Sequence, residues 1–106
     1  MTEDYLNYPT LIDNAMRLMV RDVMKQIQKD GLPGEHHFYI SFDTNHPDVE
    51  MSPQLREKYP SDMTIVMQHQ FWDFNVEDEQ FSITLSFSGA PEKMTIPYAA
   101  LTAFAD

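Results

Sequence analysis

The spacing of apolar residues changes once along this chain, and that change limits the fold more than any other feature. From residue 11 to about residue 29, apolar residues recur at helical spacing, and Gly31 and Pro33 follow where a helix would end. After Gly34 the period becomes two, with alternating apolar positions at Phe38, Ile40 and Phe42. The sequence therefore predicts an N-terminal helix followed by strands, an α+β fold that is mostly β.

Apolar residues occupy two sides of the predicted helix. One wide face is formed by Met16, Met19, Val20, Val23 and Ile27. A second apolar group lies beside this face and consists of Leu11, Ala15 and Leu18. The two groups together make the apolar surface wider than packing against one core requires, which favours burial against a partner as well as against the domain. The alternative is that both apolar groups are buried in the core of the same domain. The candidate partner contacts are Leu11, Ala15, Leu18 and Met19.

Strand and turn signals fill the rest of the chain. Ser52 and Pro53 predict the N-cap and first position of a short helical turn. Residues 63–76 are long and β-prone, with a bend or bulge expected at Phe71 and Trp72. A half-buried strand is predicted at 81–87, a turn at 88–91 and a short strand at 93–97. The alanine-rich segment 98–105 predicts a closing helix.

Length and charge exclude several classes of protein. With 106 residues, of which 42% are hydrophobic, the chain is expected to form one domain over 1–106. A net charge of −10 disfavours a phosphate-backbone ligand. The sequence contains no cysteine, no secretory signal and no apolar run long enough for a membrane span.

The sequence offers no strong candidate for a metal or catalytic site. His36 and His37 are adjacent, so in a strand they point to opposite faces. Turn chemistry explains His46 and its acidic neighbours more simply than metal binding does. No nucleophile elbow or glycine-rich phosphate loop is present. We therefore expect no metal, no cofactor and no enzymatic activity.

The segment Gln68-His69-Gln70-Phe71-Trp72 is the most unusual part of the sequence. Gln68 and Gln70 would lie on the same face of a strand. A row of amides makes a poor core and a good recognition surface, because each amide offers donors and an acceptor to a peptide. The alternative is a face that is simply exposed to water.

Taken together, these motifs resemble the SspB family. The similar stretches are YPSDMTIVMQHQFWDFNV and FSITLSFSGAPEKMTIPYAALTAFAD, and the resemblance covers residues 5–106. The QHQFWD block resembles the α-proteobacterial branch in particular. The fold that the resemblance implies is an N-terminal helix with two small antiparallel sheets in an open, Sm-like barrel or sandwich.

The resemblance also implies a function. SspB proteins are cytoplasmic homodimeric adaptors that hold the ssrA degradation tag of polypeptides from stalled ribosomes and deliver them to the ClpXP protease. In the family the tag lies in a groove between two strands, which correspond here to residues 67–71 and 84–87. The expected peptide contacts are Gln68, His69, Gln70 and Phe71 on one wall and Thr84, Ser86 and Phe87 on the other. The helix residues Leu11, Ala15, Leu18 and Met19 become the expected dimer interface.

Two departures from the family pattern accompany the resemblance. Ser88 stands where the family usually has the first glycine of F-G-G-x-P. The sequence stops at Asp106, so the flexible tail that carries the ClpX-docking motif is expected to be absent here. The rival function is an Sm-like RNA-binding module, for which the helix supplies only the basic stripe Arg17, Arg21, Lys25 and Lys29.

Overall fold

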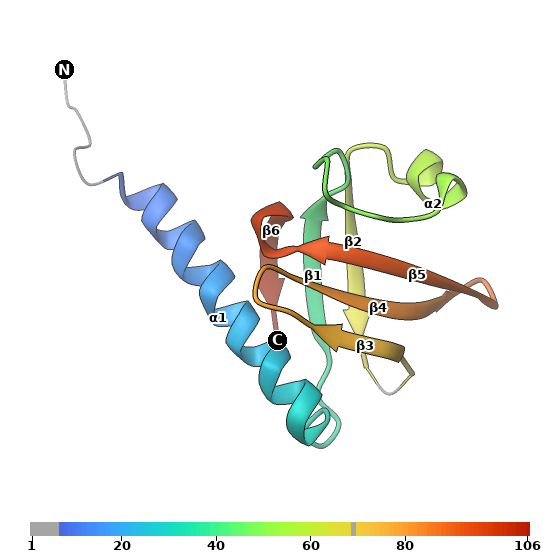
Figure 1. Cartoon of the computed structure of the whole chain (residues 1–106), viewed down its shortest axis with the longest axis horizontal. Coiled ribbons are helices and arrows are strands. Elements are labelled where there is room, and N and C mark those ends of the chain that lie inside the picture. The colour runs from blue at the N-terminus through green and yellow to red at the C-terminus, as the bar shows by residue number, and fades with distance from the viewer. Residues whose placement is uncertain (1–6, 69) are drawn as a thin grey trace.

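The computed structural model describes residues 7–68 and 70–106. Helix α1 spans Tyr8–Asp30 and the short helix α2 spans Pro53–Lys58 (Figure 1). The strands are β1 (Phe38–Asp43), β2 (Asp62–Met67), β3 (Trp72–Val76), β4 (Gln80–Phe87), β5 (Ala90–Pro97) and β6 (Leu101–Ala105). A single 3-10 turn, η1 (Tyr98–Ala100), separates β5 from β6.

The strands form two antiparallel sheets of three strands each. The order is β2-β1-β6 in the first sheet and β3-β4-β5 in the second. The two sheets do not join into one closed barrel, so β2 and β3 both remain at sheet edges. One N-terminal helix with two small antiparallel sheets is the fold class that the family resemblance implied, and it agrees with the helix followed by strands that periodicity predicted.

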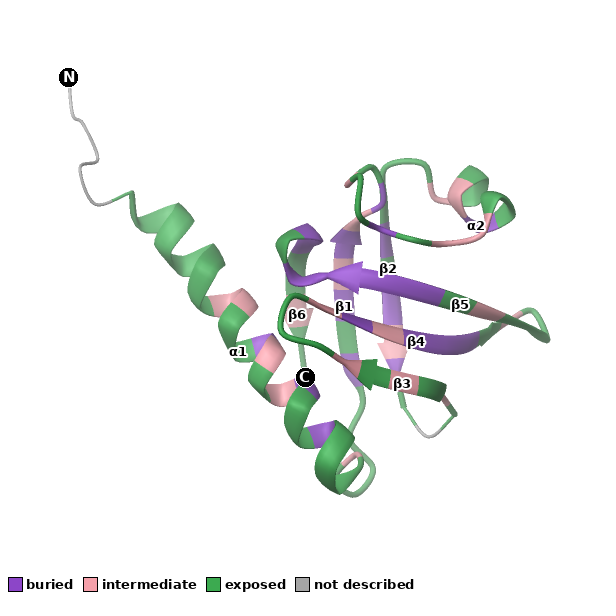
Figure 2. Ribbon diagram, viewed as in Figure 1, coloured by how far each residue is buried: buried purple, intermediate pink, exposed green. Residues whose placement is uncertain are grey.

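The core lies between the two sheets and the C-terminal half of α1. Strands β1 and β4 bury alternate apolar residues, as the period of two predicted, whereas β5 is buried continuously over residues 94–97 (Figure 2). The fully buried side chains of the core include Ile40, Phe42 and Ile65 from the first sheet, Phe81, Ile83, Met94 and Ile96 from the second, and Val20 and Met24 from α1. Burial of these apolar side chains is the main source of the fold's stability.

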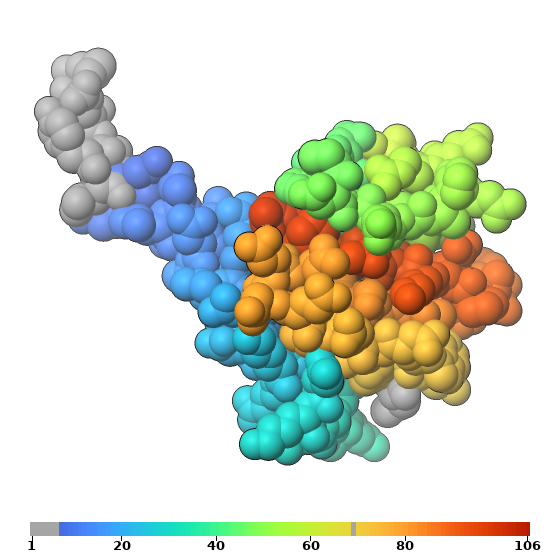
Figure 3. All heavy atoms as spheres, in the orientation of Figure 1, coloured from blue at the N-terminus to red at the C-terminus, as the bar shows by residue number. Residues whose placement is uncertain are grey.

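Helix α1 is only half covered by the rest of the molecule. It begins at Tyr8, three residues before the predicted start, with Pro9 in the first turn where a missing N–H costs nothing. Its buried residues are Val20, Met24 and Ile27, all in the C-terminal half. The N-terminal half extends beyond the sheets into solvent (Figures 1 and 3).

The prediction of a closing helix at residues 98–105 is wrong. The segment is the turn η1 followed by strand β6, which pairs with β1. A register shift in this pairing lets both Leu101 and Phe104 point inward, where Leu101 is buried and the Phe104 ring stacks on Phe38 with centroids 5.4 Å apart. The bulge therefore produces a spacing of three in a strand, which imitates one turn of a helix.

The prediction of one long strand at residues 63–76 is also wrong. β2 ends at Met67 in the first sheet, and β3 begins at Trp72 in the second. The expected bend is therefore the connection through which the chain passes from one sheet to the other. The change of sheets leaves Gln68 and Gln70 outside any strand.

The hairpin between β4 and β5 is tighter than the sequence indicated. Its turn consists of Ser88 and Gly89 alone, and β5 begins at Ala90, before the predicted start at Lys93. Both turn residues have positive φ, 52° at Ser88 and 82° at Gly89, as a two-residue type I′ turn requires. Ser88 therefore adopts the left-handed conformation in place of the glycine expected there.

Candidate functional site

A hollow of about 400 Å³ lies between the edge of the first sheet and the end of β4. We call it the groove. Strand β2 provides one wall, the end of β4 provides the other, and the connection between β2 and β3 supplies two amide side chains. The lining residues are Thr64, Ile65, Val66, Gln68, Gln70, Leu85, Ser86 and Phe87.

Both walls of the groove are strand edges. β2 is the outer strand of its sheet, and within residues 7–68 and 70–106 it pairs with β1 on one side only. The first residue of β3, Trp72, pairs with Thr84, so β3 does not extend alongside residues 85–87 of β4. A strand edge presents a row of backbone N–H and C=O groups that an added extended chain can pair with.

The groove lining combines apolar and uncharged polar groups. Ile65 and Leu85 are buried and Phe87 is half-buried, while Gln68, Gln70 and Ser86 are exposed. None of the described residues that line the groove has a charged side chain. Amides and hydroxyls both donate and accept hydrogen bonds, so this lining suits the backbone and uncharged side chains of an extended peptide.

The structure brings four of the seven predicted peptide contacts into the groove: Gln68, Gln70, Ser86 and Phe87. Thr84 does not line it, and its hydroxyl donates a hydrogen bond to Asp73 Oδ2 over 3.3 Å. Phe71 instead packs on the core, with its ring edge-on to Phe74 and the centroids 5.5 Å apart. His69 lies outside the described residues.

Thr64, Ile65 and Val66 also line the groove and were not among the predicted contacts. Their sequence is that of an ordinary alternating strand, with Met63, Ile65 and Met67 buried. Nothing in such a pattern tells an edge strand from a central one. The signal that could have found them is the interruption of the long β-prone segment at Gln68, since a chain that changes sheets there leaves β2 at an edge.

The predicted partner-contact residues of α1 are exposed. Relative exposure is 51% at Leu11, 53% at Leu18 and 47% at Met19, and Ala15 is exposed as well. Ile12, at 65%, belongs to the same surface and was not predicted. We call these five residues the α1 stripe. The alternative of a helix sunk in its own core does not hold for this half of α1.

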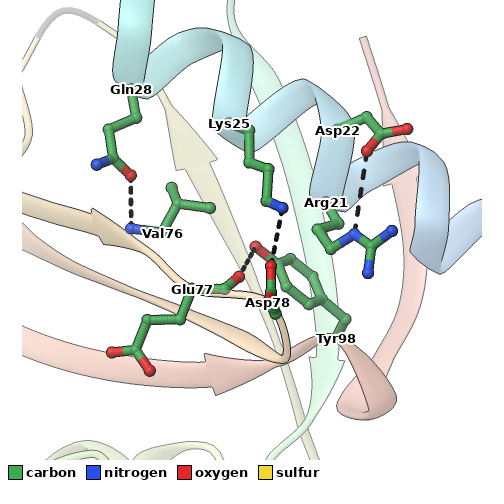
Figure 4. A network of polar contacts seen from close by, with 8 residues as sticks. All are labelled: Arg21, Asp22, Lys25, Gln28, Val76, Glu77, Asp78 and Tyr98. Atoms are coloured by element: carbon green, nitrogen blue, oxygen red, sulfur yellow. Dashed lines mark hydrogen bonds and ion pairs between the residues drawn. The ribbon is translucent and has the colours of Figure 1, made fainter.

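Polar contacts attach the other half of α1 to the second sheet (Figure 4). Lys25 Nζ donates a hydrogen bond to Asp78 Oδ1 over 2.9 Å, and the Val76 N–H donates to Gln28 Oε1 over 2.7 Å. The hydrogen bond and charge of Lys25 lower the pKa of Asp78 below its usual value. Burial raises the pKa of Tyr98 to about 12, and its hydroxyl donates to Glu77 O over 3.4 Å. The hydrogen bonds of Lys25 and Gln28 hold the C-terminal half of α1 against the second sheet.

A larger hollow, about 580 Å³, lies between α1, the β3–β4 turn and η1. Its charged lining is mixed, with Arg17 and Arg21 from α1 and three acidic residues, Asp48, Asp78 and Glu79, from the rest of the chain. Among the described residues, the buried Nε atoms of both arginines find no hydrogen-bond partner, although Arg21 Nε forms an ion pair with Asp22 Oδ1 over 3.9 Å. Opposite charges on its walls favour no single class of ligand, so the groove is the better candidate site.

The described part of the chain contains neither a cluster of metal-binding side chains nor a helix suited to crossing a membrane. No group of three or more His, Asp or Glu side chains in residues 7–68 and 70–106 is placed to hold a metal ion. Neither α1 nor α2 combines the length and the apolar run that crossing a bilayer would need.

Comparison with known proteins identifies the family. No match was found among curated proteins. A family model described as SspB, stringent starvation protein B, matches residues 10–106, which include α1 from its third residue, all six strands and the described residues of the groove. The chain therefore belongs to the SspB family.

Proposed function

We propose that this protein is a proteolytic adaptor that binds ssrA-tag peptides in the groove and delivers the tagged proteins to the ClpXP protease. Family membership supports an adaptor role in general terms. The observation that carries the finer proposal is the groove itself, where the edges of β2 and β4 and the amides of Gln68 and Gln70 surround a hollow whose described lining residues are uncharged. The QHQFWD sequence favours the α-proteobacterial type of adaptor, acting in the cytoplasm.

The proposed binding mode is strand addition. The tag enters as an extended segment between β2 and the end of β4 and pairs its backbone with one or both edges. Gln68 and Gln70 then hydrogen-bond the exposed side of the tag, while Ile65, Leu85 and Phe87 contact its apolar side chains. Ordering a flexible tag costs conformational entropy, and a groove that is already formed keeps the remaining cost of binding low.

Delivery follows from tethering. An adaptor that holds the tag and also contacts ClpX raises the local concentration of the substrate at the protease without performing any chemistry. We propose that two copies associate through the α1 stripe, so that one assembly presents two grooves. The exposed apolar side chains of Leu11, Leu18 and Met19 support this pairing.

The experiment that tests the proposal is a titration of a fluorescent ssrA peptide against the wild-type protein and against Gln68→Ala. Loss of a hydrogen bond that is buried on binding should cost about 1–3 kcal/mol, or roughly 5- to 150-fold in Kd. Gln54→Ala, on the exposed surface of α2 and away from the groove, is the matched control and should bind like the wild type.

Each result has a separate meaning. Failure of the wild-type protein to bind the peptide would overturn the adaptor proposal. Equal affinity of the wild type and Gln68→Ala would keep the function and remove Gln68 from the site.

A further inference from the structure

A second hollow adjoins the groove on the outer face of the second sheet. Its volume is about 500 Å³, and it is lined by Trp72, Asp73, Thr84, Ser86, Gly89 and Pro91. Ser86 lines both hollows. An extended chain that leaves the groove past Ser86 therefore arrives directly at Trp72.

Trp72 gives this second hollow an apolar wall. It pairs with Thr84 of β4, and Thr84 in turn pairs with Lys93 of β5, so the three residues form a row across the sheet. The Trp72 side chain is 48% exposed, whereas the neighbouring Thr84 is 8% exposed. An indole that is half in solvent beside a hollow presents a large π-face on which a ligand side chain can stack.

Asp73 gives the same hollow a hydrogen-bond acceptor. The β3–β4 register shifts between Trp72 and Asn75, and Asp73 within this shift has a φ of 51°. One Asp73 oxygen accepts a hydrogen bond from the Thr84 hydroxyl. A carboxylate has about four acceptor positions, so Asp73 retains capacity for a donor from a ligand. Its charge also disfavours an acidic side chain at this place.

We propose that this second hollow is an additional subsite for the peptide that occupies the groove, an inference that rests on the proposed function. The subsite takes an uncharged aromatic or large apolar side chain, which stacks on Trp72, with a neighbouring N–H or hydroxyl donor for Asp73. Consecutive side chains of an extended peptide alternate between its two sides, so one chain can fill the groove and reach Trp72 as it passes Ser86.

Trp72 reports directly on this subsite because it is the only tryptophan in the sequence. An ssrA peptide without tryptophan is titrated into the wild-type protein, with calorimetry measuring binding and Trp72 emission measured on the same samples. The subsite predicts a shift in emission wavelength and weaker acrylamide quenching, both saturating at the peptide concentration where the heat saturates. Heat of binding with unchanged Trp72 emission and quenching would overturn the subsite.

Variants on β3 measure what the contact contributes. Trp72→Ala should weaken binding of the ssrA peptide about 3- to 10-fold, as expected for loss of one aromatic contact. Trp72→Phe keeps a stacking surface and should restore most of the affinity. Asn75→Ala lies on the same strand but outside both hollows, and it should leave affinity unchanged. Circular dichroism spectra that match the wild type establish that each variant is folded.

The outcomes separate this inference from the proposal beneath it. No binding of the ssrA peptide by the wild type would overturn the adaptor function together with the subsite. Binding that Gln68→Ala weakens and Trp72→Ala does not would retain the groove and overturn the subsite alone.

Discussion

Tyr98 links the ionisation of one side chain to the stability of the fold. It is 6% exposed, its ring lies 5.8 Å from that of Phe81, and its hydroxyl donates to Glu77 O in the turn that also contacts α1. Burial raises its pKa to about 12, because the phenolate loses hydration in the core. At neutral pH the side chain is therefore a neutral hydrogen-bond donor.

This pKa predicts a loss of stability at alkaline pH. The unfolded chain releases the Tyr98 proton near pH 10, before the folded protein does, so ionisation favours unfolding above about pH 10. The contribution is complete below pH 10 and falls as pH rises towards about 12. Urea unfolding of wild type and Tyr98→Phe at about pH 8 and about pH 11 measures it. The free energy of unfolding should fall more in the wild type, and equal losses would contradict the raised pKa.

Single residues also show where sequence reasoning succeeded. Ser52 was predicted as a helix N-cap, and its hydroxyl accepts a hydrogen bond from the Leu55 N–H over 3.1 Å. This prediction was within reach because capping depends only on residues within one turn. Thr84, predicted as a groove contact, lines the second hollow instead, and its hydrogen bond to Asp73 depends on a register shift between strands that no local pattern encodes.

Among the elements, α1 is the one whose exposed surface requires an explanation. The α1 stripe lies on the half of the helix that extends beyond the sheets (Figure 2). Ala15 lies near the middle of this stripe, and a small side chain there permits close approach of a second helix. The C-terminal half of α1 packs on the core and hydrogen-bonds to residues 76 and 78, and these contacts anchor the helix that carries the stripe.

Leu18→Asp should convert a dimer into a monomer. Burying a leucine contributes about 1.5–3 kcal/mol, and a symmetric interface loses that contribution from both copies, besides burying two charges. Light scattering after size exclusion measures the mass. Gln54→Asp, which adds the same charge to the exposed surface of α2, should leave the mass of a dimer. A wild-type monomer, or a Leu18→Asp dimer, would contradict the proposed role of the stripe.

The element predictions were correct where residues close in sequence decide the structure, and wrong where pairing between distant segments decides it. Helix α1 and strand β4 were predicted from periodicity, because each packs one face against the core. Residues 98–105 were assigned to a helix because the bulge in β6 gives Leu101 and Phe104 a helical spacing. The sequence predicts one strand over residues 63–76 because local β-propensity continues through the connection where the chain changes sheets. Both errors concern long-range pairing, which tertiary contacts decide.

For the molecule as a whole, the groove is a product of topology. It needs β2 at the edge of one sheet, β3 too short to cover the end of β4 in the other, and a connection that places Gln68 and Gln70 between them. The family resemblance indicated two walls from residues 67–71 and 84–87, and the structure places Gln68, Gln70 and residues 85–87 of these along the groove together with residues 64–66. No single segment of the sequence contains this site.

The measurement that tests this account most directly is a map of backbone amide chemical shifts during titration with an ssrA peptide. Strand addition predicts the largest changes at residues 64–66, 68, 70 and 85–87, together with slower hydrogen exchange of edge amides in β2 and β4. Changes concentrated instead at Arg17, Arg21 and Tyr98, in the hollow beside α1, with both strand edges unaffected, would contradict it.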